Sequence, residues 1–146
     1  MDSFFEWTEI SQIAEELYEF EHCTLTRKVG PWPPGTRVDK IVLNFEEGEV
    51  SFLDQDEDEF WTGTMKIRAG GDELKFTSSK RPEEVNILIF NYSNPVLQAP
   101  LDVFQKNRTL KNIMIDYAHG DGEVEVETQD GRFIHYPLKI EVACAF

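Results

Sequence analysis

Residues 133–146 read FIHYPLKIEVACAF, and this stretch decides the fold. Every second position is large and mostly apolar: Ile134, Tyr136, Leu138, Ile140, Val142, Cys144 and Phe146. An alternation with a period of two is typical of a β-strand that places one face on a core. We therefore expect a long final strand, and its nearest partner is the segment just before it.

Residues 123–128 also alternate, and Gly131 follows them in a turn sequence. A two-residue loop would put the glutamates of this segment on the core face of the hairpin. Matching the apolar faces predicts a loop one residue longer, with Gly131 in the left-handed region. The expected partners are Val126 opposite Tyr136 and Val124 opposite Leu138. Glu123, Glu125 and Glu127 then form a row on the outer face.

The start of the chain has a different pattern. Within residues 1–22, the side chains of Ile10, Ile13, Ala14 and Leu17 follow the spacing of a helix face,. We expect an amphipathic helix with a solvated acidic side. Residues 30–35, GPWPPG, are then a stiff Pro-rich connector, and residues 36–146 form an antiparallel sheet,.

These patterns predict one domain over residues 1–146 of the α+β class, mainly β. The expected architecture is an antiparallel curled sheet, or a flattened barrel, of about eight strands with the helix against it. No βαβ alternation is present, which disfavours a parallel sheet.

Acidic residues are concentrated in three blocks of a chain whose formal charge is -14. Residues 1–21 hold seven acids, residues 46–59 eight and residues 120–131 five, and none of these blocks contains Lys or Arg. Such acidity disfavours direct binding to nucleic acid or to an anionic membrane, because both need cationic side chains. We expect neither partner, and we expect a basic protein instead.

The second block contains the strongest candidate site, the run DQDEDEFW at residues 54–61. It begins like a calcium loop, but Glu59 and Met65 stand where an EF-hand needs Gly and Glu,. A solvated hairpin tip is the plain interpretation, and a docking patch with an aromatic anchor is the functional one. The predicted partner-binding residues are Asp54, Asp56, Glu57, Asp58, Glu59, Trp61, Glu123, Glu125 and Glu127.

Catalytic and cofactor motifs are poorly supported. The run 116–121, DYAHGD, has ligand types for a metal or for acid–base chemistry, but its spacing matches no known motif,. No nucleophile elbow, phosphate-binding glycine loop or C-x-x-C pair occurs,. We therefore predict no catalytic residue, no metal and no cofactor.

The first residues, MDSFFE, lack the basic and apolar regions of a secretory signal, and two cysteines are too few for a disulfide framework,. We expect a cytoplasmic protein. The favoured function is an acidic module that neutralises or regulates a basic partner, as immunity proteins and nucleic-acid mimics do. The alternatives are a barrel-like ligand-binding protein or enzyme with an apolar pocket, and an accessory or structural subunit whose acidity serves solubility.

Overall fold

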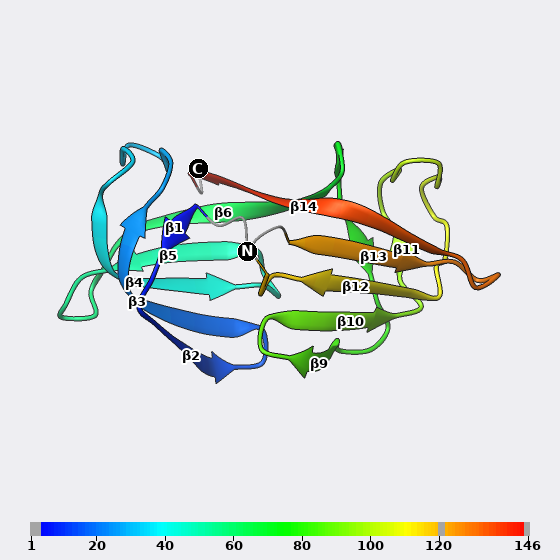
Figure 1. The fold of residues 1–146 in the computed structure, drawn as a ribbon, viewed down its shortest axis with the longest axis horizontal. Coiled ribbons are helices and arrows are strands. Elements are labelled where there is room, and N and C mark those ends of the chain that lie inside the picture. Colours follow the sequence, from blue (N-terminus) through cyan, green and yellow to red (C-terminus); the bar gives the residue numbers. More distant parts are fainter. Residues whose placement is uncertain (1–3, 120–121, 145–146) are drawn as a thin grey trace. The chain divides into compact units, whose positions relative to one another are not determined.

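The computed structural model describes residues 4–119 and 122–144, without the Cys144 side chain. These residues form fourteen strands, and twelve of them belong to one antiparallel sheet (Figure 1). The strands are β1 (Phe5–Glu6), β2 (Glu9–Ala14), β3 (Leu17–Leu25), β4 (Arg37–Asn44), β5 (Glu49–Leu53), β6 (Glu59–Ala69), β7 (Asp72–Glu73), β8 (Phe76–Thr77), β9 (Glu83–Asn86), β10 (Ile89–Ser93), β11 (Val96–Leu97), β12 (Asn112–Asp116), β13 (Glu123–Glu127) and β14 (Phe133–Cys144).

The predicted N-terminal helix is wrong. The described part of residues 1–22 contains β1, β2 and most of β3. Tyr18 and Phe20 explain the difference, because both are fully buried and both lie opposite buried residues of β4. Positions two apart share one face of a strand, whereas a helix would separate them by about 200°.

The helical spacing that suggested the helix has no structural counterpart. Ile10 and Ile13 lie in β2, where Ile13 is 52% exposed. Glu15 and Glu16 form the turn that leads into β3, and Glu16 has a φ of 57°. Pairing of the aromatic residues with β4 therefore overrides the local helical pattern.

The α+β class and the flattened barrel are also wrong, whereas the antiparallel arrangement is confirmed. No helix occurs in residues 4–119 or 122–144, and the sheet formed by these residues is not closed. The estimate of about eight strands was low, because the N-terminal segment contributes three strands and several others contain only two residues.

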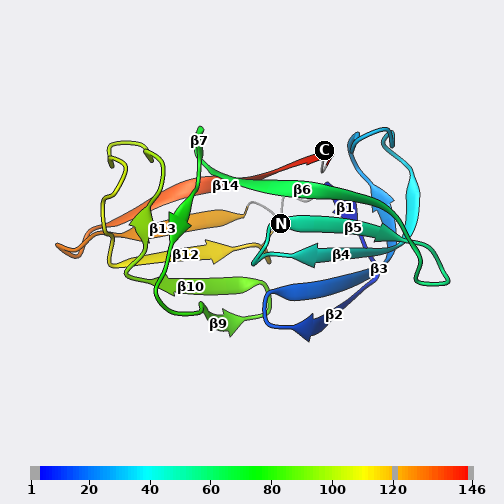
Figure 2. The same ribbon diagram turned by 180° about the vertical axis from the view of Figure 1, so that it is seen from behind.

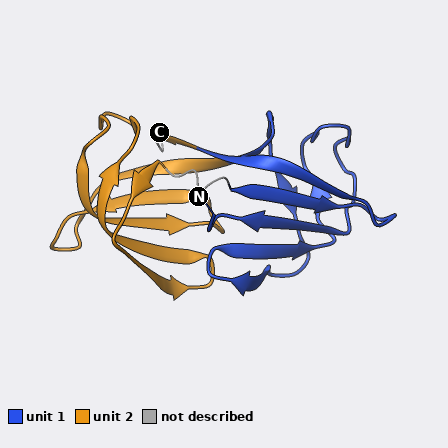
Figure 3. Cartoon of the chain, in the orientation of Figure 1, with its two compact units in different colours: residues 1–2, 67–140 blue, residues 3–66, 141–146 orange. Residues whose placement is uncertain are grey.

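The chain divides into two compact units (Figure 3). Unit 2 consists of residues 3–66 and 141–146. In it, β3 pairs with β1 and β2 on one side and with β4 on the other, and β4 continues to β5 and β6 (Figure 2). Its core contains Phe4, Phe5, Tyr18, Phe20, Ile41, Leu43, Val50 and Phe52, all fully buried.

Unit 1 consists of residues 1–2 and 67–140. Its main strand order is β14, β13, β12, β10 and β9, and β8 pairs separately with β11. Its core includes Phe90, Leu97, Leu101, Leu110, Ile113, Val124 and Val126, all fully buried.

The hairpin of β13 and β14 confirms the three-residue loop. Gly131 has a φ of 86°, and its N–H donates to the Thr128 carbonyl at 3.0 Å. Val126 lies opposite Ile134, two positions from the predicted partner. The predicted partners imply a loop over residues 130–132. The observed loop spans residues 129–131, with the glycine as its third residue. A shift of two positions keeps every side chain on its predicted face.

Candidate functional site

The tip of the β5–β6 hairpin is built around Asp54. Its Oδ1 accepts the N–H of Asp56 at 2.9 Å and that of Asp58 at 3.0 Å. The backbone N–H of Asp54 also donates to the Asp58 carbonyl at 3.0 Å. One carboxylate of the predicted site therefore shapes the turn, and the carboxylates of Asp56, Asp58 and Glu59 stay exposed,.

Lys40 connects this tip to the N-terminal strands. Its Nζ lies 2.5 Å from Glu57 Oε1, 3.0 Å from Glu19 Oε1 and 3.9 Å from Glu21 Oε1. Glu21 is the neighbour of Lys40 in the β3–β4 ladder. Two sequence blocks that are far apart in the chain thus converge on one cation.

Hydrogen bonds between oppositely charged side chains shift the pKa values of Lys40 and Glu57. The hydrogen bond to the Glu57 carboxylate, followed by that to Glu19, raises the pKa of Lys40,. The same bond to Lys40 lowers the pKa of Glu57. All these groups are close to solvent, so the pairs orient the side chains more than they stabilise the fold.

Glu9 adds a further carboxylate to this surface. It lies opposite Glu21 in the β2–β3 ladder, and directly opposed residues point to the same face of a sheet,. We call the set Glu9, Glu19, Glu21, Glu57 and Lys40 the acidic face. Three of its carboxylates, those of Glu19, Glu21 and Glu57, contact the Lys40 ammonium group.

The acidic charge is unequally divided between the units. Unit 2 contains 16 of the 28 Asp and Glu residues but only 5 of the 14 Lys and Arg residues, a formal charge of -11. Unit 1 contains 12 acids and 9 bases, a formal charge of -3. Unit 2 is therefore the main source of the negative potential.

The aromatic residues beside the tip have different environments. Trp61 packs on Phe52 with a ring-centroid distance of 4.7 Å, and a Cβ added at Gly63 would clash with the Trp61 ring. The Trp61 indole therefore fills space within unit 2. Phe60 is 44% exposed, and its ring centroid lies 5.7 Å from that of Trp32. Phe60 is therefore more accessible than Trp61.

Glu123, Glu125 and Glu127 do form a row beside the buried valines of β13. Side chains of unit 1 already contact each of them. His135 lies between Glu123 and Glu125, with Nδ1 against Glu123 and Nε2 3.5 Å from Glu125 Oε2. Lys111 Nζ lies 3.3 Å from Glu127 Oε2.

The predicted site residues therefore belong to different units. Asp54, Asp56, Glu57, Asp58, Glu59 and Trp61 belong to unit 2, and Glu123, Glu125 and Glu127 belong to unit 1. That the two sets form one surface stays a prediction. Sequence reasoning missed Lys40, Glu9, Glu19 and Glu21 as parts of the site, although Lys40 is the only base between Arg37 and Lys66.

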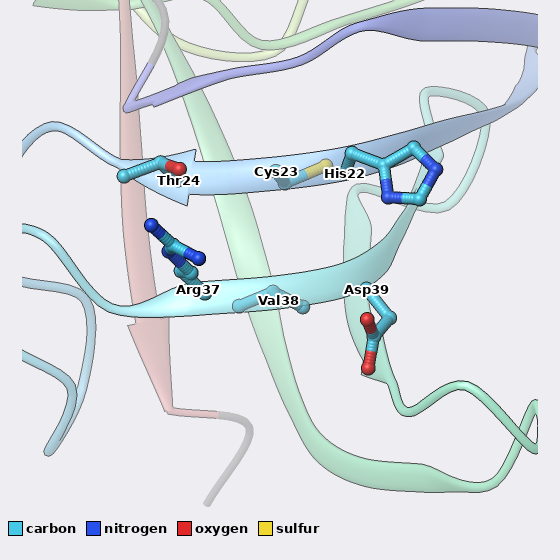
Figure 4. Close-up of a pocket in the computed structure, with 6 residues that line it drawn as sticks. All are labelled: His22, Cys23, Thr24, Arg37, Val38 and Asp39. Carbon is cyan, nitrogen blue, oxygen red and sulfur yellow. The ribbon is translucent and has the colours of Figure 1, made fainter.

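A recess of about 280 Å³ lies elsewhere in unit 2 (Figure 4). It is open to solvent and is lined by His22, Cys23, Thr24, Arg37, Val38 and Asp39 from β3 and β4. Burial raises the pKa of the Cys23 thiol to about 12,. A thiol in this environment is a packing group rather than a nucleophile.

The other candidate chemistry is sparse. His119 Nδ1 contacts Asp116 Oδ2 at 2.6 Å, and Asp121 lies outside the described residues. In the described part of the chain, no group of three or more His, Cys, Asp or Glu side chains is arranged to hold a metal ion. The same residues include no helix with the length and apolar character to cross a membrane.

No known protein family matches this chain, and no curated protein or solved structure matches it either. The fold and the candidate site define an all-β protein whose acidic face lies on one unit.

Proposed function

We propose that this protein binds a basic protein and neutralises or regulates it, with the acidic face and the tip residues Asp56, Asp58 and Glu59 as the docking surface. The convergence of Glu19, Glu21 and Glu57 on Lys40 carries the proposal. It joins the first two acidic blocks on one unit. The proposed class is an immunity-protein or nucleic-acid-mimic type of inhibitor, acting in the cytoplasm.

The physical basis is electrostatic complementarity. A surface with a large excess of carboxylates speeds the encounter with a cationic partner and orients it. Lys40 supports this role, because it holds the Glu19 and Glu57 side chains in place before a partner arrives. Pre-ordered side chains lose less conformational entropy on binding.

Glu123, Glu125 and Glu127 remain in the proposal as a second contact. Each of them already contacts His135 or Lys111, and a partner would have to displace these contacts, as it would those of Glu19, Glu21 and Glu57 with Lys40. The exposed carboxylates of the tip have no such competitor among the described residues.

Salt-dependent capture from the source cells tests the proposal. The immobilised protein is loaded with lysate at low salt, and retained proteins are eluted with rising salt and identified. A protein rich in Lys and Arg should elute at moderate salt, because counter-ions screen the surface charges. The triple variant Asp56→Asn, Asp58→Asn and Glu59→Gln should lose this protein.

A matched control separates a docking surface from general charge. Glu46→Gln, Glu47→Gln and Glu49→Gln remove the same formal charge at the other end of β5. This variant should retain the basic protein. The proposal is contradicted if both variants retain the basic protein equally, or if the wild-type protein captures no basic protein. Either result favours the alternative in which the acidity serves only solubility.

The recess beside Cys23 does not favour the alternative of a small-ligand protein. Four of its six lining residues, His22, Thr24, Arg37 and Asp39, carry polar or charged side chains. An apolar ligand pocket instead needs an enclosed hydrophobic wall with a few polar groups.

A further inference from the structure

β2 is an edge strand of unit 2 and lies beside the acidic face. Among the described residues, β2 pairs with β3 alone, and its six residues are exposed or half-buried. An edge strand presents backbone N–H and C=O groups that a further strand can bond. Lys and Pro, which commonly protect such edges, are absent from Glu9–Ala14,.

The regular part of this edge is short and well defined. Residues Glu9 to Gln12 pair with β3 in continuous register, and a bulge at Ile13 ends the regular ladder. Four residues in register can guide an added strand of similar length. The bulge makes continuation beyond it unfavourable, because it disrupts the hydrogen-bond pattern.

The two faces of this part of β2 differ in character. Glu9 and Ser11 lie opposite Glu21 and Glu19, so they belong to the acidic side. Ile10 lies opposite the buried Phe20, on the side of the core. An added strand would continue both faces, with alternate side chains beside the glutamates and beside Ile10.

We propose that β2 accepts an extended basic segment of the partner as an additional strand, in which cationic and apolar side chains alternate. The cationic side chains meet Glu9, Glu19 and Glu21, and the apolar ones cover Ile10. Backbone hydrogen bonds supply affinity in this mode of recognition, and the alternating side chains supply specificity. This inference rests on the proposed function and names its mode of binding.

Charge argues against a second copy of this chain as the occupant. Pairing of two β2 edges would bring together two units that each carry a formal charge of -11. Like charges across such an interface oppose association. A basic segment removes this repulsion and is therefore the favoured occupant.

Amide hydrogen exchange of the full-length, 15N-labelled protein tests the inference. The probe is a capped seven-residue peptide in which lysine and valine alternate. The control peptide has glycine in place of valine, so it carries the same charge but forms strands poorly. With the first peptide, the outward-facing amides of residues 9–12 should exchange at least tenfold more slowly.

The outcomes separate this inference from the proposed function. Equal binding of both peptides, without slower exchange in β2, overturns the added strand but leaves an acidic docking surface. If neither peptide binds, the result contradicts both the added strand and the acidic docking surface. Slow exchange of the outward amides in concentrated protein without peptide overturns the basic segment and identifies a second copy.

Proline variants give an independent readout. Adjacent residues of a strand point their N–H groups toward opposite edges, so only one of Ser11→Pro and Gln12→Pro interrupts the ladder with β3. The variant that keeps the wild-type Tm should lose the preference for the valine peptide. Unchanged preference overturns the inference, and if neither variant folds, the exchange measurement decides.

Discussion

Lys40 and Glu57 form an ion pair across 17 residues of chain, with Nζ 2.5 Å from Oε1. Lys40 lies in the middle of the β4 ladder, whereas Glu57 lies in the turn after β5 and has a φ of 64°. This contact attaches the hairpin tip to the regular sheet, and loops of this kind are in general more mobile than strands. It also brings the second acidic block next to the first.

Replacing Lys40 by Gln should lower the Tm at neutral pH, because Glu19, Glu21 and Glu57 then repel one another. Lys40 holds the pKa of Glu57 below its ordinary value of 4.5. The stabilisation is therefore present above about pH 4.5 and is lost as the pH falls through the lowered pKa of Glu57. The difference in Tm between wild type and variant should shrink over that window. Lys40→Arg is the control and should behave like wild type.

Removing the Asp54 carboxylate should loosen the hairpin tip. Asp54→Ala deletes the acceptor for the N–H groups of Asp56 and Asp58, and we expect a loss of about 1 kcal/mol in unfolding free energy. Amide exchange at these two positions should become faster. Asp54→Asn keeps a side-chain oxygen and should largely preserve both values. Unchanged exchange in the alanine variant would refute the proposed role of Asp54.

Substitution of Gly131 should destabilise the protein because of the backbone conformation alone. A Cβ added there meets nothing within 4 Å, but the residue has a φ of 86°. Gly131→Ala should cost about 1 kcal/mol in urea unfolding. Gly71 also has open space around an added Cβ, and its φ is not in the left-handed region. Gly71→Ala should therefore be neutral or slightly stabilising, and equal losses at both positions would contradict the argument.

The Cys23 thiol should react with a disulfide reagent only after unfolding. Its side chain is buried, and burial raises its pKa from 9.0 to about 12. The measurement uses a Cys144→Ser background, so that only one thiol reports. Reaction at the rate of an exposed thiol, under native conditions, would show that Cys23 is accessible.

The same shift affects stability at high pH. The pKa of the Cys23 thiol is higher in the folded state than in the unfolded state. Its contribution to the free energy of unfolding is therefore complete below about pH 9 and falls as the pH rises toward 12,. The slope for one such group is at most about 1.4 kcal/mol per pH unit. Cys23→Ala should show a shallower decline than the parent in urea unfolding between these values.

Local sequence pattern accounts for the strands whose partners are near in the chain. The β13–β14 hairpin was predictable because a period of two and a glycine turn together determine which faces match. The pattern also placed Glu123, Glu125 and Glu127 on the outer face. It could not identify His135 and Lys111 as their neighbours, because that requires the register across three strands.

The N-terminal segment shows where local pattern fails. Ile10, Ile13, Ala14 and Leu17 have helical spacing, but Tyr18 and Phe20 bury completely only when they lie on one face of a strand. The residues that decide between these two structures are Ile41 and Leu43 in β4, which lie far downstream. Tertiary pairing overrides a weak local preference in such a case.

The sequence by itself determined the excess of acid, its concentration in blocks and the alternating strands, because these are properties of residues close together in the chain. Only the tertiary structure decided that Glu19, Glu21 and Glu57 surround Lys40 and that β2 is an edge strand. Both depend on hydrogen-bond ladders between distant segments. Their register is set by the burial of a shared core, which no short stretch of sequence contains.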